Sequence, residues 1–99
     1  MQKTLDGEKI REYKDDIGKR LRRIEGQIKG IQKMVEEGKN CVDILTQVAA
    51  VRAAITKVGG MILENHSRAC IYQALETGRK DELLDELIET LQKFIKYVD

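Results

Sequence analysis

The fold is decided by residues 40–78, which read NCVDILTQVAAVRAAITKVGGMILENHSRACIYQALETG. Apolar residues recur every three or four positions along this stretch, as they do on the buried face of an α-helix. Asn40 is a favourable N-cap, and Asp43 follows it closely, where the helix dipole favours a carboxylate. Gly78 is a typical residue to end a helix. The pattern therefore predicts one long central helix that ends near Thr77.

Helical periodicity continues on both sides of this stretch. Before it, apolar residues in one continuous stripe predict a helix over residues 8–37, which Gly38 ends. After it, a helix is predicted from about Lys80, because carboxylates crowd its first turns and apolar residues recur beyond them. The sequence contains no proline, and 41% of its residues are hydrophobic and 35% charged, which favours amphipathic helices over a sheet. The predicted fold class is all-α, a three-helix protomer with a long central helix.

The length of 99 residues predicts a single helical domain over residues 1–99. Long helices from so short a chain leave an apolar stripe uncovered, so we expect a homo-oligomer, a dimer or tetramer. No stretch is apolar enough to cross a membrane, and the polar N-terminus lacks a secretion signal, so we expect a cytoplasmic protein with no membrane partner. Thiols stay reduced there, and the two cysteines are then ligands or reactive groups rather than a disulfide.

The two cysteines and the single histidine all lie in the central stretch. His66 and Cys70 are four residues apart, so they share one face of a helix and can bind one ion. Cys41 lies about 25 residues before His66, roughly 37 Å of helix, so the two cannot meet on one straight helix. If two copies pack antiparallel, Cys41 of one lies beside His66 and Cys70 of the other. Small residues between Ala49 and Ala54, near the midpoint, would permit a close crossing.

Two thiolates and one imidazole form a soft ligand set, which favours Cu(I). Zn(II) normally requires a fourth ligand, which water or Glu86 would have to supply. Nickel and cobalt usually take more nitrogen and oxygen ligands, and a single histidine weighs against them. Taken one at a time, the three residues are compatible with buried cysteines and a surface histidine. Together, in a chain with no other Cys or His, they predict a metal site.

A more specific pattern lies at residues 21–31, LRRIEGQIKGI. It resembles the signature of the copper-sensitive operon repressor family (CsoR/RcnR type), and the resemblance covers nearly the whole chain. The Cys…His-x3-Cys pattern of Cys41, His66 and Cys70 is similar to the ligand set of the Cu(I)-sensing subtype. The resemblance implies a dimer of dimers, each antiparallel dimer packing as a four-helix bundle, that binds operator DNA without metal. Cu(I) would then release the DNA and derepress copper efflux and homeostasis genes.

Other branches of that family differ at the candidate ligands. Nickel- and cobalt-sensing relatives carry His where Cys70 stands, sulfur-sensing relatives lack the histidine at position 66, and formaldehyde-sensing relatives use an N-terminal proline. The resemblance also implies hydrogen-bonding neighbours of the metal. Asn40 stands where copper-type relatives often have Tyr, and Glu86 aligns with the other such position. The network around His66 is therefore expected to be altered but present.

The predicted DNA contacts are basic residues: Lys19, Arg20, Arg22, Arg23 and Lys57. The sequence shows no helix-turn-helix or zinc-finger pattern. Basic side chains from several subunits would contact phosphates, with an affinity that depends on salt. The alternative is a solvated helix face whose charge is balanced by Asp15, Asp16 and Glu25. The family resemblance favours DNA.

Three other functions compete with a copper-responsive repressor. A copper storage or trafficking protein would use the same metal site without DNA. A thiol- or persulfide-responsive repressor would use Cys41 and Cys70, but that chemistry does not need His66. A hydrolytic enzyme is disfavoured, because the chain offers no Asp/His/Ser arrangement and no evident substrate pocket. The sequence therefore predicts a non-enzymatic Cu(I)-responsive transcriptional repressor with operator DNA as partner and no organic substrate.

Overall fold

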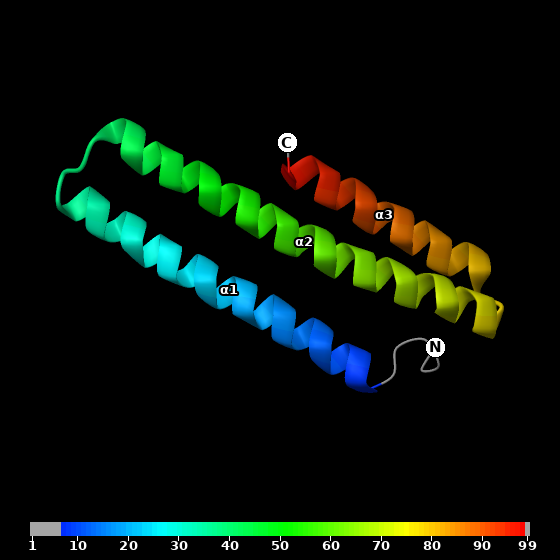
Figure 1. Ribbon diagram of the computed structural model, residues 1–99. Coiled ribbons are helices and arrows are strands. Elements are labelled where there is room, and N and C mark those ends of the chain that lie inside the picture. The colour runs from blue at the N-terminus through cyan, green and yellow to red at the C-terminus, as the bar shows by residue number, and fades with distance from the viewer. Residues whose placement is uncertain (1–6, 99) are drawn as a thin grey trace. The chain divides into compact units, whose positions relative to one another are not determined.

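The computed structural model describes residues 7–98, and the side chains of residues 11–96. Its helices are α1 (Gly7–Glu36), α2 (Cys41–Thr77) and α3 (Lys80–Val98), and the described residues contain no strand (Figure 1). The predicted all-α protomer with a long central helix is confirmed. The observed helix boundaries lie within one residue of the predicted ones.

The end of α1 is set by Gly38, which adopts a φ of 66°. Glycine enters this left-handed region without the steric cost that a Cβ would bring. The turn lets the Lys39 N–H donate to the carbonyl of Met34 at 3.0 Å, and the Gly38 N–H to that of Val35 at 3.1 Å. These bonds satisfy carbonyls that the last turn of a helix leaves without partners.

The two ends of α2 follow equally local rules. Asn40 caps the first turn, because its Oδ1 accepts a hydrogen bond from the Val42 N–H at 2.7 Å and its carbonyl accepts one from the Ile44 N–H at 3.1 Å. At the other end Gly78 has a φ of 77°, and its N–H donates to the carbonyl of Ala74 at 3.3 Å. Both predicted boundary residues therefore act as the sequence indicated.

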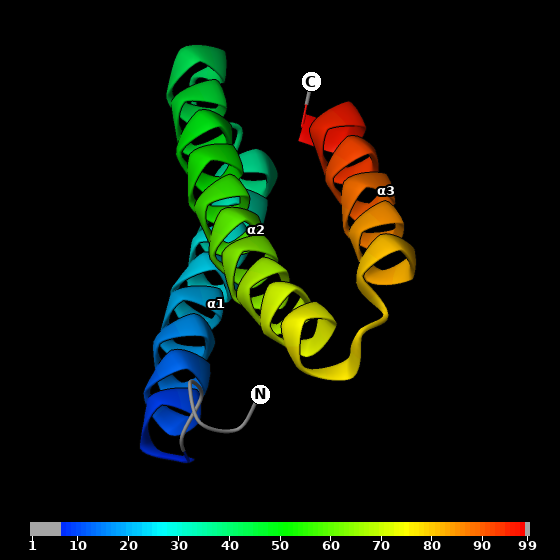
Figure 2. The ribbon, with the colours of Figure 1, turned by 90° about the vertical axis from the view of Figure 1, so that its right-hand side faces the viewer.

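The chain divides into two compact units. The first, Glu12–Gly59, is called here the α1–α2 unit, in which α1 and the first half of α2 form an antiparallel helical hairpin (Figure 1). The second, formed mainly by residues from Gly60 onward, is the α2–α3 unit, in which α3 turns back beside the second half of α2 (Figure 2). The predicted ligands are thus divided between units that each have their own packing.

The apolar stripe of α1 is divided in two. Ile17 and Ile24, seven residues apart, are buried at 9% and 5% exposure. Leu21, Ile28 and Val35, also seven apart, are 41%, 45% and 59% exposed. A spacing of seven keeps each set on its own line along the helix. The sequence predicted one continuous stripe, but one protomer buries only one of its two lines.

The α2–α3 unit has a small core in which Cys70 and Ala74 of α2 pack with Leu83 and Leu87 of α3, and Leu91 packs against them. Other large apolar residues of this unit remain exposed: Ile62, Ile71, Leu75, Ile88 and Ile95. Within the described residues, no helix is both long and apolar enough to span a membrane.

Candidate metal site and basic surface

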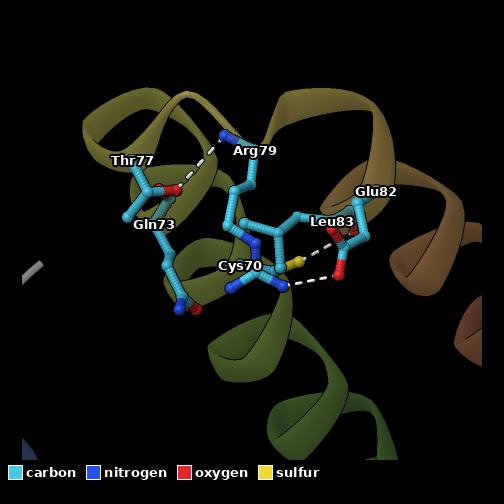
Figure 3. A network of polar contacts seen from close by, with 6 residues as sticks. All are labelled: Cys70, Gln73, Thr77, Arg79, Glu82 and Leu83. Carbon is cyan, nitrogen blue, oxygen red and sulfur yellow. Dashed lines mark hydrogen bonds and ion pairs between the residues drawn. The ribbon is translucent and has the colours of Figure 1, made fainter.

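Cys70 is buried in the core of the α2–α3 unit, with 5% of its surface exposed. Its Sγ donates a hydrogen bond to the carbonyl oxygen of Leu83 at 3.2 Å (Figure 3). Leu83 lies in the first turn of α3, where its own N–H donates to the carbonyl of Arg79 at 3.1 Å. The thiol therefore ties the second half of α2 to the beginning of α3.

Polar contacts around Arg79 hold the connection between α2 and α3 next to this thiol (Figure 3). The Arg79 N–H donates to Thr77 Oγ1 at 3.3 Å, and the Arg79 guanidinium donates to Glu82 Oε1 at 2.6 Å. The hydrogen bond from Arg79 holds the pKa of Glu82 below its ordinary value and raises the pKa of Arg79. Because both side chains are exposed, water screens this pair and its stabilising effect is small.

His66 lies one turn before Cys70 on α2, so the predicted pair shares one side of the helix. The histidine is exposed, whereas the cysteine is buried. Glu86, the predicted neighbour of His66, is exposed on α3, and its carbonyl accepts a hydrogen bond from Thr90 Oγ1 at 3.0 Å. Among residues 11–96, no hydrogen bond or ion pair joins His66 to Glu86. The structure places His66 and Cys70 one turn apart on α2, and it shows no hydrogen bond between His66 and Glu86 among these residues.

Cys41 is the first residue of α2 and is exposed in the α1–α2 unit. Its apolar neighbours Val42 and Leu45 are 69% and 58% exposed. Asn40, predicted to neighbour the metal, uses its side-chain oxygen to cap α2. An amide also carries an NH₂ donor, so capping is compatible with a second contact.

In the described part of a single chain, no three His, Cys, Asp or Glu side chains gather into a metal site. His66 and Cys70 belong to the α2–α3 unit, and Cys41 belongs to the α1–α2 unit. The three donors nevertheless form a set of two sulfurs and one imidazole nitrogen. Their chemistry fits a soft ion such as Cu(I) and is poor in the oxygen donors that hard ions require.

Three of the predicted DNA-contacting residues line one shallow depression of about 190 Å³ on α1, together with Asp16: Lys19, Arg20 and Arg23. Lys19 and Arg20 follow Asp16 by three and four residues, and Arg23 follows them by four and three, which places all four residues on one side of the helix. Arg20 Nε donates to Asp16 Oδ1 at 3.1 Å. Sequence reasoning treated Asp16 only as general charge balance, although its four-residue spacing from Arg20 could have identified the pair.

The other two predicted DNA-contacting residues, Arg22 and Lys57, are exposed but do not line this depression. The guanidinium of Arg22 folds back along α1 toward Gly18, where a Cβ would stand 3.4 Å from Arg22 Nη1. The basic block that is continuous in sequence is therefore divided in space.

Comparisons with known proteins identify the family of this chain. The sequence profile described as a metal-sensitive transcriptional repressor matches residues 13–93. The copper-sensing transcriptional repressor CsoR of Bacillus subtilis is 45% identical over 94 residues, covering 95% of this chain and 92% of that protein. The copper-sensing transcriptional repressor RicR of Mycobacterium tuberculosis is 45% identical over 67 residues, covering 68% of this chain and 70% of that protein.

Two solved structures are similar in both fold and sequence. The nickel-responsive transcriptional regulator InrS is 42% identical, with a TM-score of 0.75 over 81% of this chain and 90% of that one. The copper-sensing repressor CsoR with Cu(I) from Geobacillus thermodenitrificans is 43% identical, with a TM-score of 0.74 over 82% of this chain and 84% of that one. Relatives that respond to different metals therefore share this fold.

Proposed function

The chain belongs to the family of metal-sensitive transcriptional repressors, and from this membership we propose that it represses transcription until Cu(I) binds and releases it from operator DNA. The family is one of regulators rather than enzymes, as the sequence predicted. The observation that carries the choice of metal is the donor set, because His66 and Cys70 share one side of α2 and Cys41 is the remaining thiol. Two thiolates and one imidazole suit Cu(I) better than nickel.

Each metal site in this proposal uses two chains, with Cys41 from one protomer and His66 and Cys70 from another. Cys41 and His66 lie about 25 residues apart on one unbroken helix, roughly 37 Å of helical rise. An antiparallel pairing of two α2 helices brings the opposite ends together. The uncovered apolar residues around Cys41 support this pairing, because a second copy would bury them. The resulting antiparallel dimer is a four-helix bundle, and two dimers form the proposed homotetramer.

Cys70 offers a direct route from metal to structure. Cysteine binds a metal as the thiolate, so a metal-bound Cys70 has no proton to donate to Leu83. Coordination would therefore remove the hydrogen bond that ties α2 to the first turn of α3. A metal-bound His66 keeps a second ring nitrogen, and Glu86 on α3 is its proposed acceptor. Metal binding would exchange one contact with α3 for another and so reposition that helix.

The proposed DNA surface combines the depression on α1 with its exposed basic neighbours: Lys19, Arg20, Arg22, Arg23 and Lys57. Phosphate contacts from several protomers would supply the affinity. A repressor that binds operator DNA acts where that DNA is, so the proposed location is the cytoplasm. The genes proposed to be regulated are those of copper efflux and homeostasis.

The test is DNA binding by the whole apoprotein, measured anaerobically as Cu(I) is added with a competing chelator. DNA from upstream of the chain's own gene and of copper-efflux genes in the same genome serves as probe, and Ni(II), Zn(II) and polysulfide are the comparison effectors. We expect release with Cu(I) at far lower free concentration than with the other metals. Tight Cu(I) binding without any DNA binding would instead indicate a storage or trafficking protein. Release by polysulfide alone, with a Cys41–Cys70 crosslink between chains, would indicate a thiol-responsive repressor.

A further inference from the structure

The depression on α1 contains an acidic side chain among its basic ones. Asp16 lines it with Lys19, Arg20 and Arg23, and accepts a hydrogen bond from Arg20 Nε at 3.1 Å. Both partners are accessible, since the Asp16 side chain is 50% exposed and that of Arg20 is 42% exposed. A surface assigned to phosphate therefore already contains one anion, supplied by the chain itself.

We propose that Asp16 is an intramolecular competitor of DNA phosphate, which weakens binding of the repressor to duplex of any sequence. The inference rests on the proposed DNA-binding function and assigns a residue that limits the affinity of that function for DNA of any sequence. A phosphodiester that enters the depression to meet Lys19 and Arg23 also approaches the carboxylate of Asp16. It must either share Arg20 with that carboxylate or displace it.

Two physical effects make Asp16 unfavourable to a bound phosphate. The carboxylate occupies the Nε donor of Arg20, one of the five N–H groups through which a guanidinium binds oxyanions. It also repels a second anion at short range in a surface depression where water screens charges only partly. Because phosphate contacts supply the affinity for non-specific DNA, the penalty falls on every sequence. A uniform penalty lowers the affinity for the operator and for all other DNA alike, so Asp16 limits overall DNA affinity rather than sequence preference.

The chain offers a matched control in the neighbouring residue. Asp16→Asn removes the negative charge but keeps a side-chain oxygen that can accept the hydrogen bond from Arg20. Asp15→Asn makes the same change of net charge one position earlier, at an exposed residue that does not line the depression. Any effect of overall charge appears in both variants, and an effect of the depression appears only in Asp16→Asn.

The experiment measures binding of full-length apoprotein to a random-sequence duplex by fluorescence anisotropy over a range of salt concentrations, with helix content checked by circular dichroism. We expect Asp16→Asn to tighten binding roughly three- to ten-fold and Asp15→Asn by less than about two-fold. Asp16→Asn should also steepen the dependence of log affinity on log salt by about one unit, because no carboxylate then neutralises the charge of Arg20 and a DNA phosphate can do so instead.

Equal tightening by both variants would overturn the inference, since Asp16 would then act only through net charge. Weaker binding by Asp16→Asn would also overturn it, since Asp16 would then position Arg20 for DNA. In both cases the wild type still binds duplex and the proposed function survives. A wild type that binds no duplex even at low salt would remove the proposed function and this inference together.

Discussion

In the α2–α3 unit, Cys70 is buried and donates a hydrogen bond to Leu83, whereas in the α1–α2 unit Cys41 is exposed at the first residue of α2. Cys70 packs in a core with Ala74, Leu83 and Leu87, whereas Val42 and Leu45, close to Cys41 in sequence, are exposed. Within one protomer, Cys70 is thus surrounded by packed side chains, whereas Cys41 is not. The difference indicates that Cys70 has a structural role in the metal-free protein, while Cys41 has none that one chain provides.

The largest expected effect is a loss of Cu(I) affinity, and it should be similar for the two cysteines. Cys41→Ala and Cys70→Ala should each weaken Cu(I) binding by at least about 100-fold, because each removes a charged, soft donor. His66→Ala should cost less, since two thiolates remain. Chelator competition measures the affinities, and X-ray absorption of the wild type should show two sulfurs and one nitrogen around copper. A shell of four sulfurs, or one rich in oxygen, would contradict the assigned ligands.

A mixing experiment tests whether each metal site takes Cys41 from one chain and His66 and Cys70 from another. Neither Cys41→Ala nor His66→Ala should retain an intact site as a homo-oligomer. In a mixed dimer both substitutions fall on the same one of its two sites, and the other site regains all three ligands. We therefore expect tight Cu(I) binding to reappear on mixing, at one site per mixed dimer. A mixture that regains no tight binding, or a Cys41→Ala protein that never lost it, would contradict a shared site.

The next effect concerns DNA and belongs to the α1–α2 unit alone. Replacing Arg20 and Arg23 together with alanine should weaken binding to duplex DNA about ten-fold or more and flatten its dependence on salt, because phosphate contacts release counterions. Cu(I) affinity should change little, since both residues lie on α1 and the predicted ligands lie on α2. Titrations of the same preparation with DNA and with Cu(I) test both statements. Unchanged DNA binding would mean that other basic residues contact the DNA, and Lys57 would be the first to test.

The contrast between the units also shows which structural features could be predicted from the sequence alone. Helix boundaries were predictable because Gly38, Asn40 and Gly78 act through bonds to residues a few positions away. The pairing of His66 with Cys70 was predictable for the same reason, since helical spacing is local. The bond from Cys70 to Leu83 crosses between two helices, and no periodicity encodes it.

Two further features depend on how side chains meet in space. The apolar residues of α1 follow one another at intervals of three or four residues. This spacing predicts a single apolar stripe and does not show which residues of the stripe the protomer buries. Only packing separates Ile24, which is buried, from Ile28, which is exposed. Similarly, Arg22 and Arg23 are adjacent in sequence, but only Arg23 lines the depression.

Substitutions of the two cysteines should have similar effects on Cu(I) affinity but different effects on the free energy of unfolding. In the apoprotein Cys70→Ala should lower the free energy of unfolding by about 1–2 kcal/mol, because it removes a buried hydrogen bond and core volume. Cys41→Ala should change it by less than about 0.5 kcal/mol, because Cys41 is exposed within its own chain and removing its small side chain takes nothing from that chain's core. Urea unfolding at one fixed protein concentration makes the comparison, since oligomerisation contributes to stability. Equal losses would mean that Cys41 is already packed in the metal-free oligomer.

The smallest effect tests how the metal signal reaches α3. If a metal-bound His66 donates a hydrogen bond to Glu86, Glu86→Ala should reduce the change in DNA affinity caused by Cu(I) by about five-fold, or about 1 kcal/mol of coupling. By linkage, DNA should then weaken Cu(I) binding by a correspondingly smaller factor. Asp85→Ala is the control, because it removes the same charge from the adjacent exposed position of α3. The measurement is DNA affinity with and without Cu(I) for the wild type and both variants, with Cu(I) affinity measured separately. A full copper response in Glu86→Ala would exclude this route and leave the loss of the Cys70–Leu83 hydrogen bond as the remaining link to α3. In that case a His66 variant that still binds Cu(I) through its two thiolates should release DNA as well as the wild type does.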